Sequence, residues 1–147
     1  MPSLTFPLPK RHLTPPLAPE PRTVYLPALR LSILNKANKQ SFETYAIIDS
    51  GAAANLFPAK IAETIGIKPI ENERGELFTG IASQKVIGYP HHVGLELGGH
   101  HFETTIYFSP HVDEQTLLLG MRGFFSLFAV KIDVGRERIE LTPLKRK

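Results

Sequence analysis

One short stretch of the chain carries an acid in surroundings that favour reactivity. An apolar run over residues 46–48 ends at Asp49, and Ser50, Gly51 and three alanines follow. An unpaired carboxylate is costly to bury, so its place after an apolar strand indicates a chemical role. Gly51 permits a sharp turn and close approach of a ligand, and the Ser50 hydroxyl both donates and accepts hydrogen bonds. The stretch predicts a reactive carboxylate at the floor of a groove.

The alternative interpretation of Asp49 is a surface turn. Asp-Ser-Gly tripeptides often fold through hydrogen bonds between side chain and backbone. A surface turn, however, has no need of apolar residues on one side and small residues on the other. The context therefore favours the reactive interpretation.

The stretch around Asp49 resembles the active-site loop of retropepsin-like, single-lobe aspartic proteases. The family pattern is an apolar pair, Asp, Ser or Thr, Gly, Ala and a small polar residue three positions later. The matching residues are Ile47, Ile48, Asp49, Ser50, Gly51, Ala52 and Asn55. Two further segments follow in the family's order: a glycine-bearing hairpin tip within residues 78–88, and an apolar run ending in glycine within residues 117–125.

The resemblance implies a mostly β, closed-barrel acid protease fold with one or two short helices, active as a two-fold dimer. Asp49 would be catalytic, and Ser50, Gly51 and Ala52 would support its loop, with the Ser50 hydroxyl bonding across the dimer axis. The implied flap and substrate-contacting residues are Ala53, Thr79, Gly80, Ile81 and Ala82, and the implied second glycine loop is formed by Leu119 and Gly120. Viral members carry an acid where this chain has Ala53, so substrate contacts differ. Residues 138–143 would form the C-terminal interface strand.

Hydrolysis of peptide bonds by carboxylates needs two of them, one to activate water and one to donate to the scissile carbonyl. Asp113 and Asp133 lie in polar, turn-like stretches and are expected to be structural. A second copy of the chain must then supply the other Asp49, in the symmetric geometry of a two-fold dimer. The expected function is an aspartic endopeptidase that acts on peptides or proteins without a metal or organic cofactor. The alternative is a catalytically inactive module of the same fold that dimerises or binds peptides.

Composition sets the remaining expectations. The chain has 147 residues, enough for one domain, and no cysteine. Residues 1–22 hold seven of the thirteen prolines and predict a flexible N-terminal arm outside the core. The folded domain is expected over residues 23–143, with a basic tail at 144–147. A net charge of +3 is too small to imply nucleic acid, and no apolar run reaches the length of a membrane span. Without a signal-peptide pattern, a cytoplasmic location is expected.

Turn residues separate short β-type runs along the chain. The sequence predicts strands at residues 23–34, 41–48, 93–97, 100–108, 116–120, 130–133 and 138–143, and helices at 58–66 and 121–130. Gly98 and Gly99 predict a two-residue hairpin turn.

Other motifs carry weaker signals. The hairpin register would place the pair His91–His92 about 17 Å from His100–His101, too far for one metal ion. A GXXG at residues 120–123 occurs in RNA-binding domains but is only four residues long. The chain has neither a nucleophile elbow nor a phosphate loop.

Overall fold

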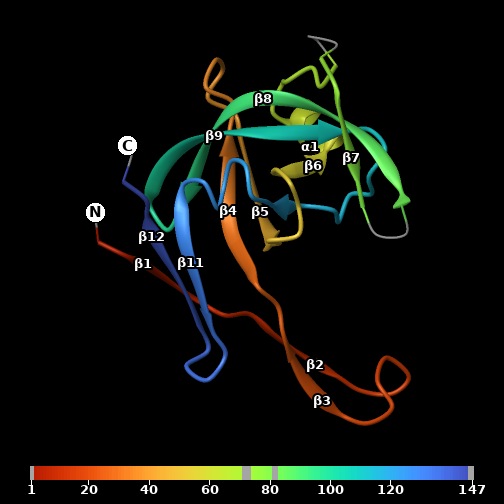
Figure 1. Cartoon of the computed structure of the whole chain (residues 1–147), viewed down its shortest axis with the longest axis vertical. Helices are drawn as coiled ribbons and strands as arrows, with labels where there is room; N and C mark the ends of the chain where they lie inside the picture. Colours follow the sequence, from red (N-terminus) through yellow and green to blue (C-terminus); the bar gives the residue numbers. More distant parts are fainter. Residues whose placement is uncertain (1, 71–73, 81–82, 146–147) are drawn as a thin grey trace.

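The computed structural model describes residues 2–70, 74–80 and 83–145 of the chain, most of them in β-strands (Figure 1). In chain order the elements are β1 (Leu4–Pro7), β2 (Lys10–Leu13), β3 (Arg22–Tyr25), β4 (Ala28–Leu34), β5 (Ser41–Ile48), β6 (Leu56–Pro58), α1 (Ala59–Thr64), β7 (Glu76–Thr79), β8 (Lys85–Leu97), β9 (His100–Ser109), β10 (Leu118–Leu119), β11 (Phe128–Asp133) and β12 (Arg138–Pro143). The prediction of a mostly β chain is confirmed.

The main sheet has the strand order β4-β5-β10-β6-β9-β8-β7. Strand β4 pairs with β5 along its whole length and also with β8 over Ser32–Leu34. These pairings link six strands in a ring, and only β7 lies outside it. The long hairpin β8–β9 turns at Gly98 and Gly99, with Leu97 opposite His100 and His92 opposite Thr105, as the sequence predicted.

The core is built from alternating apolar residues of the ring strands together with buried residues of β1, β11 and β12. Strand β4 shows the pattern, since Leu29, Leu31 and Ile33 are buried while Arg30 between them is exposed. Four phenylalanines are almost completely buried: Phe57, Phe108, Phe124 and Phe128. Each such side chain stabilises the fold by roughly 1.5–3 kcal/mol through removal of apolar surface from water.

The N-terminal segment contributes to the core, which corrects the expectation of a flexible arm over residues 1–22. Strand β1 pairs antiparallel with β12, and Leu4 and Leu8 are buried in the main core cluster. Proline is tolerated here because β1 lies at the edge of its sheet. The pairing joins two ends of the sequence more than 130 residues apart, so no local pattern could indicate it.

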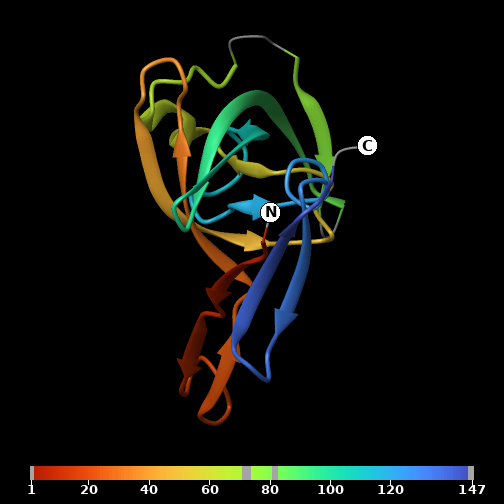
Figure 2. The same cartoon turned by 90° about the vertical axis from the view of Figure 1, so that its left-hand side faces the viewer.

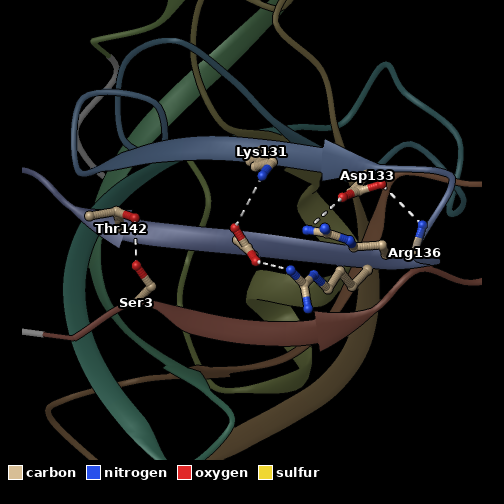
Figure 3. A network of polar contacts seen from close by, with 7 residues as sticks. Ser3, Lys131, Asp133, Arg136 and Thr142 are labelled. Carbon is tan, nitrogen blue, oxygen red and sulfur yellow. Dashed lines mark hydrogen bonds and ion pairs between the residues drawn. The ribbon is translucent and has the colours of Figure 1, made fainter.

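Strand β12 is the central strand of a second sheet, of order β1-β12-β11. Polar contacts cross it on both sides (Figure 3): Ser3 Oγ lies 2.8 Å from Thr142 Oγ1 on β12, and Lys131 of β11 forms an ion pair with Glu140. Residues 138–143 were expected to pair with a second chain at the dimer interface. Both edges of this strand are instead occupied within one chain.

Strands β2 and β3 form a separate two-stranded sheet that we call the β2–β3 hairpin, residues 10–25. Figures 1 and 2 both show it projecting away from the rest of the molecule. The expected boundary between an arm and a domain at residues 22 and 23 therefore falls inside β3. The strand predicted over residues 23–34 is divided into β3 and β4 because Pro27 offers no N–H for a ladder.

The predicted helix at residues 58–66 is confirmed as α1, which begins after Pro58 and ends before Gly66 (φ +78°). The helix predicted at residues 121–130 is wrong. Residues 123–127 form consecutive turns after an isolated bridge between Arg122 and Ala54, and β11 begins at Phe128. Gly123 adopts φ +100°, a conformation that a right-handed helix excludes, and the Phe125 N–H bonds to the Gly120 carbonyl five residues back. No helix in the described part of the chain is long and apolar enough to cross a membrane.

Candidate active site

Asp49 directly follows β5 and opens a loop that runs to Asn55. The backbone of Asp49 remains tied to the sheet, because its N–H donates to the Leu119 carbonyl at 2.9 Å. Its side chain is half-buried, and Oδ1 accepts a hydrogen bond of 2.9 Å from the Gly51 N–H. This bond fixes the carboxylate relative to its own loop while leaving the side chain partly open to solvent.

The loop keeps its side chains small where they face outward. Ser50, Gly51 and Ala53 are exposed, and Ala52 is half-buried. A Cβ at Gly51 would lie 3.2 Å from Asp49 Oδ1, a tight contact with the carboxylate itself. Glycine at this position therefore leaves the space beside the acid free.

A second loop, residues 120–123, crosses directly behind the first. Strand β10 runs parallel to β5, with Leu119 opposite Ile48, and carries the chain to Gly120. The N–H of Met121 then donates to the Ala52 carbonyl at 2.8 Å, and the N–H of Arg122 donates to the Ala53 carbonyl at 3.0 Å. The predicted second glycine loop is thus bonded along the backbone of the Asp49 loop.

Gly120 permits this close crossing. A Cβ there would lie 2.3 Å from the Ala54 carbonyl oxygen and 2.7 Å from the Ala52 carbonyl oxygen. Both are backbone atoms, so they cannot rotate away as a side chain would, and the Ala52 carbonyl is also held by the Met121 N–H. Any residue other than glycine would push the two loops apart.

Asn55 joins the two loops through its buried side-chain amide. Oδ1 accepts from the Gly120 N–H at 3.0 Å, and Nδ2 donates to the Thr105 carbonyl at 3.2 Å. The neighbouring Thr104 hydroxyl donates to the Gly123 carbonyl at 2.6 Å, which ties the second loop to β9 as well. The sequence pattern included Asn55 without giving it a role, and nothing in the sequence singled out Thr104.

The expected flap corresponds to the hairpin of β7 and β8. Thr79 is the last residue of β7, and the Gly80 N–H donates to the Gln84 carbonyl at 2.7 Å across the tip. Both residues are exposed. Ile81 and Ala82, also expected in the flap, lie outside the described residues.

A small apolar cluster packs this hairpin against the Asp49 loop. Phe78 of β7 lies in one cluster with Ala54 and Leu56, and its ring meets that of Tyr107 edge-on at a centroid distance of 5.0 Å. The hairpin is thus anchored beside the loop that carries the acid.

An ion pair makes a second link between the hairpin and the loops. Arg122, on the second loop, pairs with Glu76 at the start of β7, and its guanidinium lies 5.4 Å from the centre of the Tyr107 ring. The hydrogen bonds that Arg122 donates to Glu76 raise the pKa of Arg122 above its ordinary value. The positive charge is therefore permanent at this edge of the site. No local sequence pattern indicates this pair, because its members are 46 residues apart.

The other aspartates have turn roles. Asp113 Oδ1 accepts from the Gln115 N–H and the Thr116 hydroxyl, and Asp133 Oδ1 accepts from the Arg136 N–H. Within the described residues, no three histidine, cysteine, aspartate or glutamate side chains converge in a way that would hold a metal ion. The structure thus brings together Asp49, its loop and the second glycine loop, with the β7–β8 hairpin packed beside them.

No family model and no curated protein matches the chain. Among solved structures, the chain is similar to the EIAV protease complexed with the inhibitor HBY-793. The TM-score is 0.47 and the sequence identity is 15%, over 65% of this chain and 82% of that one. A likeness at this level concerns overall β architecture alone, so the functional proposal below is based on the residues of the site.

Proposed function

We propose that the chain is an aspartic endopeptidase of the retropepsin-like kind, active as a homodimer built around a closed β-barrel. Two copies meet on a two-fold axis so that the Asp49 carboxylates face each other and hold one water molecule. The observation that carries the proposal is the Asp49 loop itself: a half-buried acid among small residues, bonded to a second loop that crosses at Gly120.

Symmetry would provide the acid and the base that the reaction requires. Two full charges about 3 Å apart repel by roughly 5 kcal/mol at an effective dielectric constant of about 20, so the pair shares one proton. The ionised carboxylate takes a proton from water, and the protonated carboxyl donates to the scissile carbonyl. The water oxygen then bonds to the carbonyl carbon, and the proton passes to the leaving amine as the C–N bond breaks.

Neighbouring residues would support this chemistry. The exposed Ser50 hydroxyl would bond across the axis and keep the two carboxyl groups coplanar. The β7–β8 hairpin would close over the peptide and exclude water, with Thr79 and Gly80 near its tip. Ala53 would leave the adjoining substrate position without charge. No metal or organic cofactor takes part in these steps.

The decisive experiment is a cleavage assay at pH 4–6 on a denatured protein substrate. Wild type should cleave, Asp49→Asn should not, and Asp113→Asn should match wild type because its role is to cap a turn. Equal cleavage by wild type and Asp49→Asn would refute the aspartyl mechanism. If a folded, dimeric wild type fails to cleave, the alternative of a peptide-binding or dimerisation module is favoured.

A further inference from the structure

The β2–β3 hairpin has too few internal contacts to be explained as a self-sufficient element. Its two strands share four residue pairs, which extend roughly 13 Å before the turn at residues 14–21. Leu17 in that turn is 71% exposed. Isolated two-stranded hairpins are marginal in water, so this one is expected to pack against another surface.

The base of the hairpin is held firmly and aimed away from its own barrel. Glu137, in the turn between β11 and β12, accepts hydrogen bonds from the Tyr25 hydroxyl at 2.9 Å and the Lys10 ammonium at 3.2 Å. The Leu8 N–H donates to the Glu137 carbonyl, and the Leu26 N–H donates to the Pro9 carbonyl. Since both views show the hairpin directed outward, its tip does not fold back on its own chain (Figures 1 and 2).

The same base lies next to Asp49. The Ile48 N–H donates to the carbonyl of Pro27 at 2.7 Å, and Asp49 is the following residue. Neighbouring strands are about 4.8 Å apart, so an axis that brings two Asp49 carboxylates together passes within about 10 Å of each hairpin base. A hairpin that starts close to the axis and extends beyond its own barrel is in a position to reach the partner.

The terminal sheet does not offer an alternative strand-pairing interface at β12. That strand is bonded to β1 on one side and to β11 on the other. Contacts that hold two Asp49 residues face to face would therefore come from elements other than β12.

A groove on the barrel matches the tip of the hairpin. It has a volume of about 520 Å³ and lies between the N-terminal segment and β4; its lining includes Phe6, Pro7, Leu29, Leu31, Tyr45, Glu43 and Glu96. A leucine with adjoining prolines suits such an apolar space. Arg30 also lines the groove and pairs with Glu43, while Lys10 of the hairpin is bonded to Glu137. The charges that remain to complement each other are Arg11 and Arg22 on the hairpin and Glu96 in the groove.

We propose that the β2–β3 hairpin is a dimerisation arm that crosses the two-fold axis and places Leu17 in this groove on a second copy of the chain. The inference depends on the proposed function, because the paired Asp49 residues define the axis. It adds the element that holds the pair together, and it makes Leu17 and Tyr45 neighbours across the interface.

Sedimentation of the full chain tests the arm without reference to activity. Wild type should sediment as a dimer, and Leu17→Asp should weaken dimerisation at least tenfold in Kd, as loss of a central interface anchor does. Ile70→Asp is the matched control, since Ile70 is also an exposed apolar residue and is 48% accessible. Thermal unfolding checks that both variants are folded. If Leu17→Asp dimerises as tightly as wild type, or if wild type itself remains monomeric, the β2–β3 hairpin is not a dimerisation arm.

Cross-linking tests the position of the tip, because the chain has no native cysteine. Leu17→Cys and Tyr45→Cys are purified separately, mixed and oxidised. A covalent dimer should form much faster in this mixture than in a mixture of Ile70→Cys with Tyr45→Cys. Equal rates in the two mixtures would refute docking in the groove.

The arm and the proposed function can fail separately. If wild type shows Asp49-dependent cleavage while Leu17→Asp remains dimeric, the arm is wrong and the protease proposal stands. If the cross-link forms but wild type does not cleave, the protease proposal is wrong and docking of the hairpin stands.

Discussion

Asn55 holds the candidate site together, although its side chain takes no part in the proposed chemistry. Its amide links the Asp49 loop, the second glycine loop and strand β9 in one buried network. Networks of this kind are costly to break, because each group that loses its partner stays buried. The geometry of Asp49 therefore depends on residues behind it.

Replacement of this amide is the first prediction at the residue scale. Asn55→Ala should lower the free energy of unfolding by about 2–4 kcal/mol, since it leaves the Gly120 N–H and the Thr105 carbonyl unpaired. Urea denaturation measures the change, and Gln115→Ala at an exposed position is the control. A loss below about 0.5 kcal/mol, the range of ordinary surface substitutions, would contradict the role given to Asn55.

The second prediction at this scale concerns the substitution of Gly120. Gly120→Ala should destabilise the chain by about 2 kcal/mol or more, because its methyl group would overlap two backbone carbonyls. Gly135→Ala should be nearly neutral, since its nearest neighbour would be a side-chain oxygen at 3.5 Å. Thermal unfolding of both variants gives the comparison, and similar midpoints would show that the loops do not cross as tightly as described.

Asp49 could be predicted as a site residue from the sequence, but the residues that surround it in the structure could not. The apolar lead-in and the small residues that follow are local features, so they can be read along the chain. Thr104 and the pair of Arg122 with Glu76 come from segments far apart, and each residue looks ordinary among its own neighbours. Only the strand pairings bring them to the site.

At the scale of elements, Glu137 controls the direction of the β2–β3 hairpin. Hydrogen bonds from Tyr25 and then Lys10 hold the pKa of Glu137 below its ordinary value of 4.5. A carboxyl group with a lowered pKa stabilises the folded state fully above its unfolded pKa, and this stabilisation is lost as the pH falls through the folded value. The stabilisation by the anchor is therefore full above about pH 4.5 and declines as the pH falls below that value.

The Glu137→Gln variant should remove this pH dependence. Above about pH 5 the variant should unfold more readily than wild type, and the difference should shrink as the pH falls below about 4. Denaturation midpoints at a series of pH values measure the effect. A difference that stays constant from pH 3 to pH 7 would show that Glu137 does not act through its charge.

Elements set by adjacent residues could be predicted from the sequence, whereas pairings between distant segments could not. Hairpins and the helix α1 were predictable, because Gly98, Gly99 and Pro58 act on adjacent residues. The pairing of β1 with β12 was not, since its two strands are separated by almost the whole chain. The turns after Gly120 were mistaken for a helix because burial of Phe124 and Phe128 has a helix-like spacing.

At the scale of the whole molecule, the proposed catalyst is shared between two chains. Wild type and Asp49→Asn are mixed in equal amounts and allowed to exchange subunits. The activity should fall to about half of that measured for the same amount of wild type alone, because mixed dimers carry only one intact acid. Asp113→Asn in the same mixture should cause no loss. Additive activities after full exchange would indicate that each chain works alone.

The bond between Glu137 and the base of the hairpin sets an order of events during biosynthesis. A ribosome releases residues 10–25 more than 100 residues before Glu137, the residue that orients them. Until then the hairpin has no fixed direction and β1 has no strand to join. A nascent polypeptide that stops short of Glu137 would thus lack an oriented arm, and the proposed dimer could assemble only after that residue has emerged.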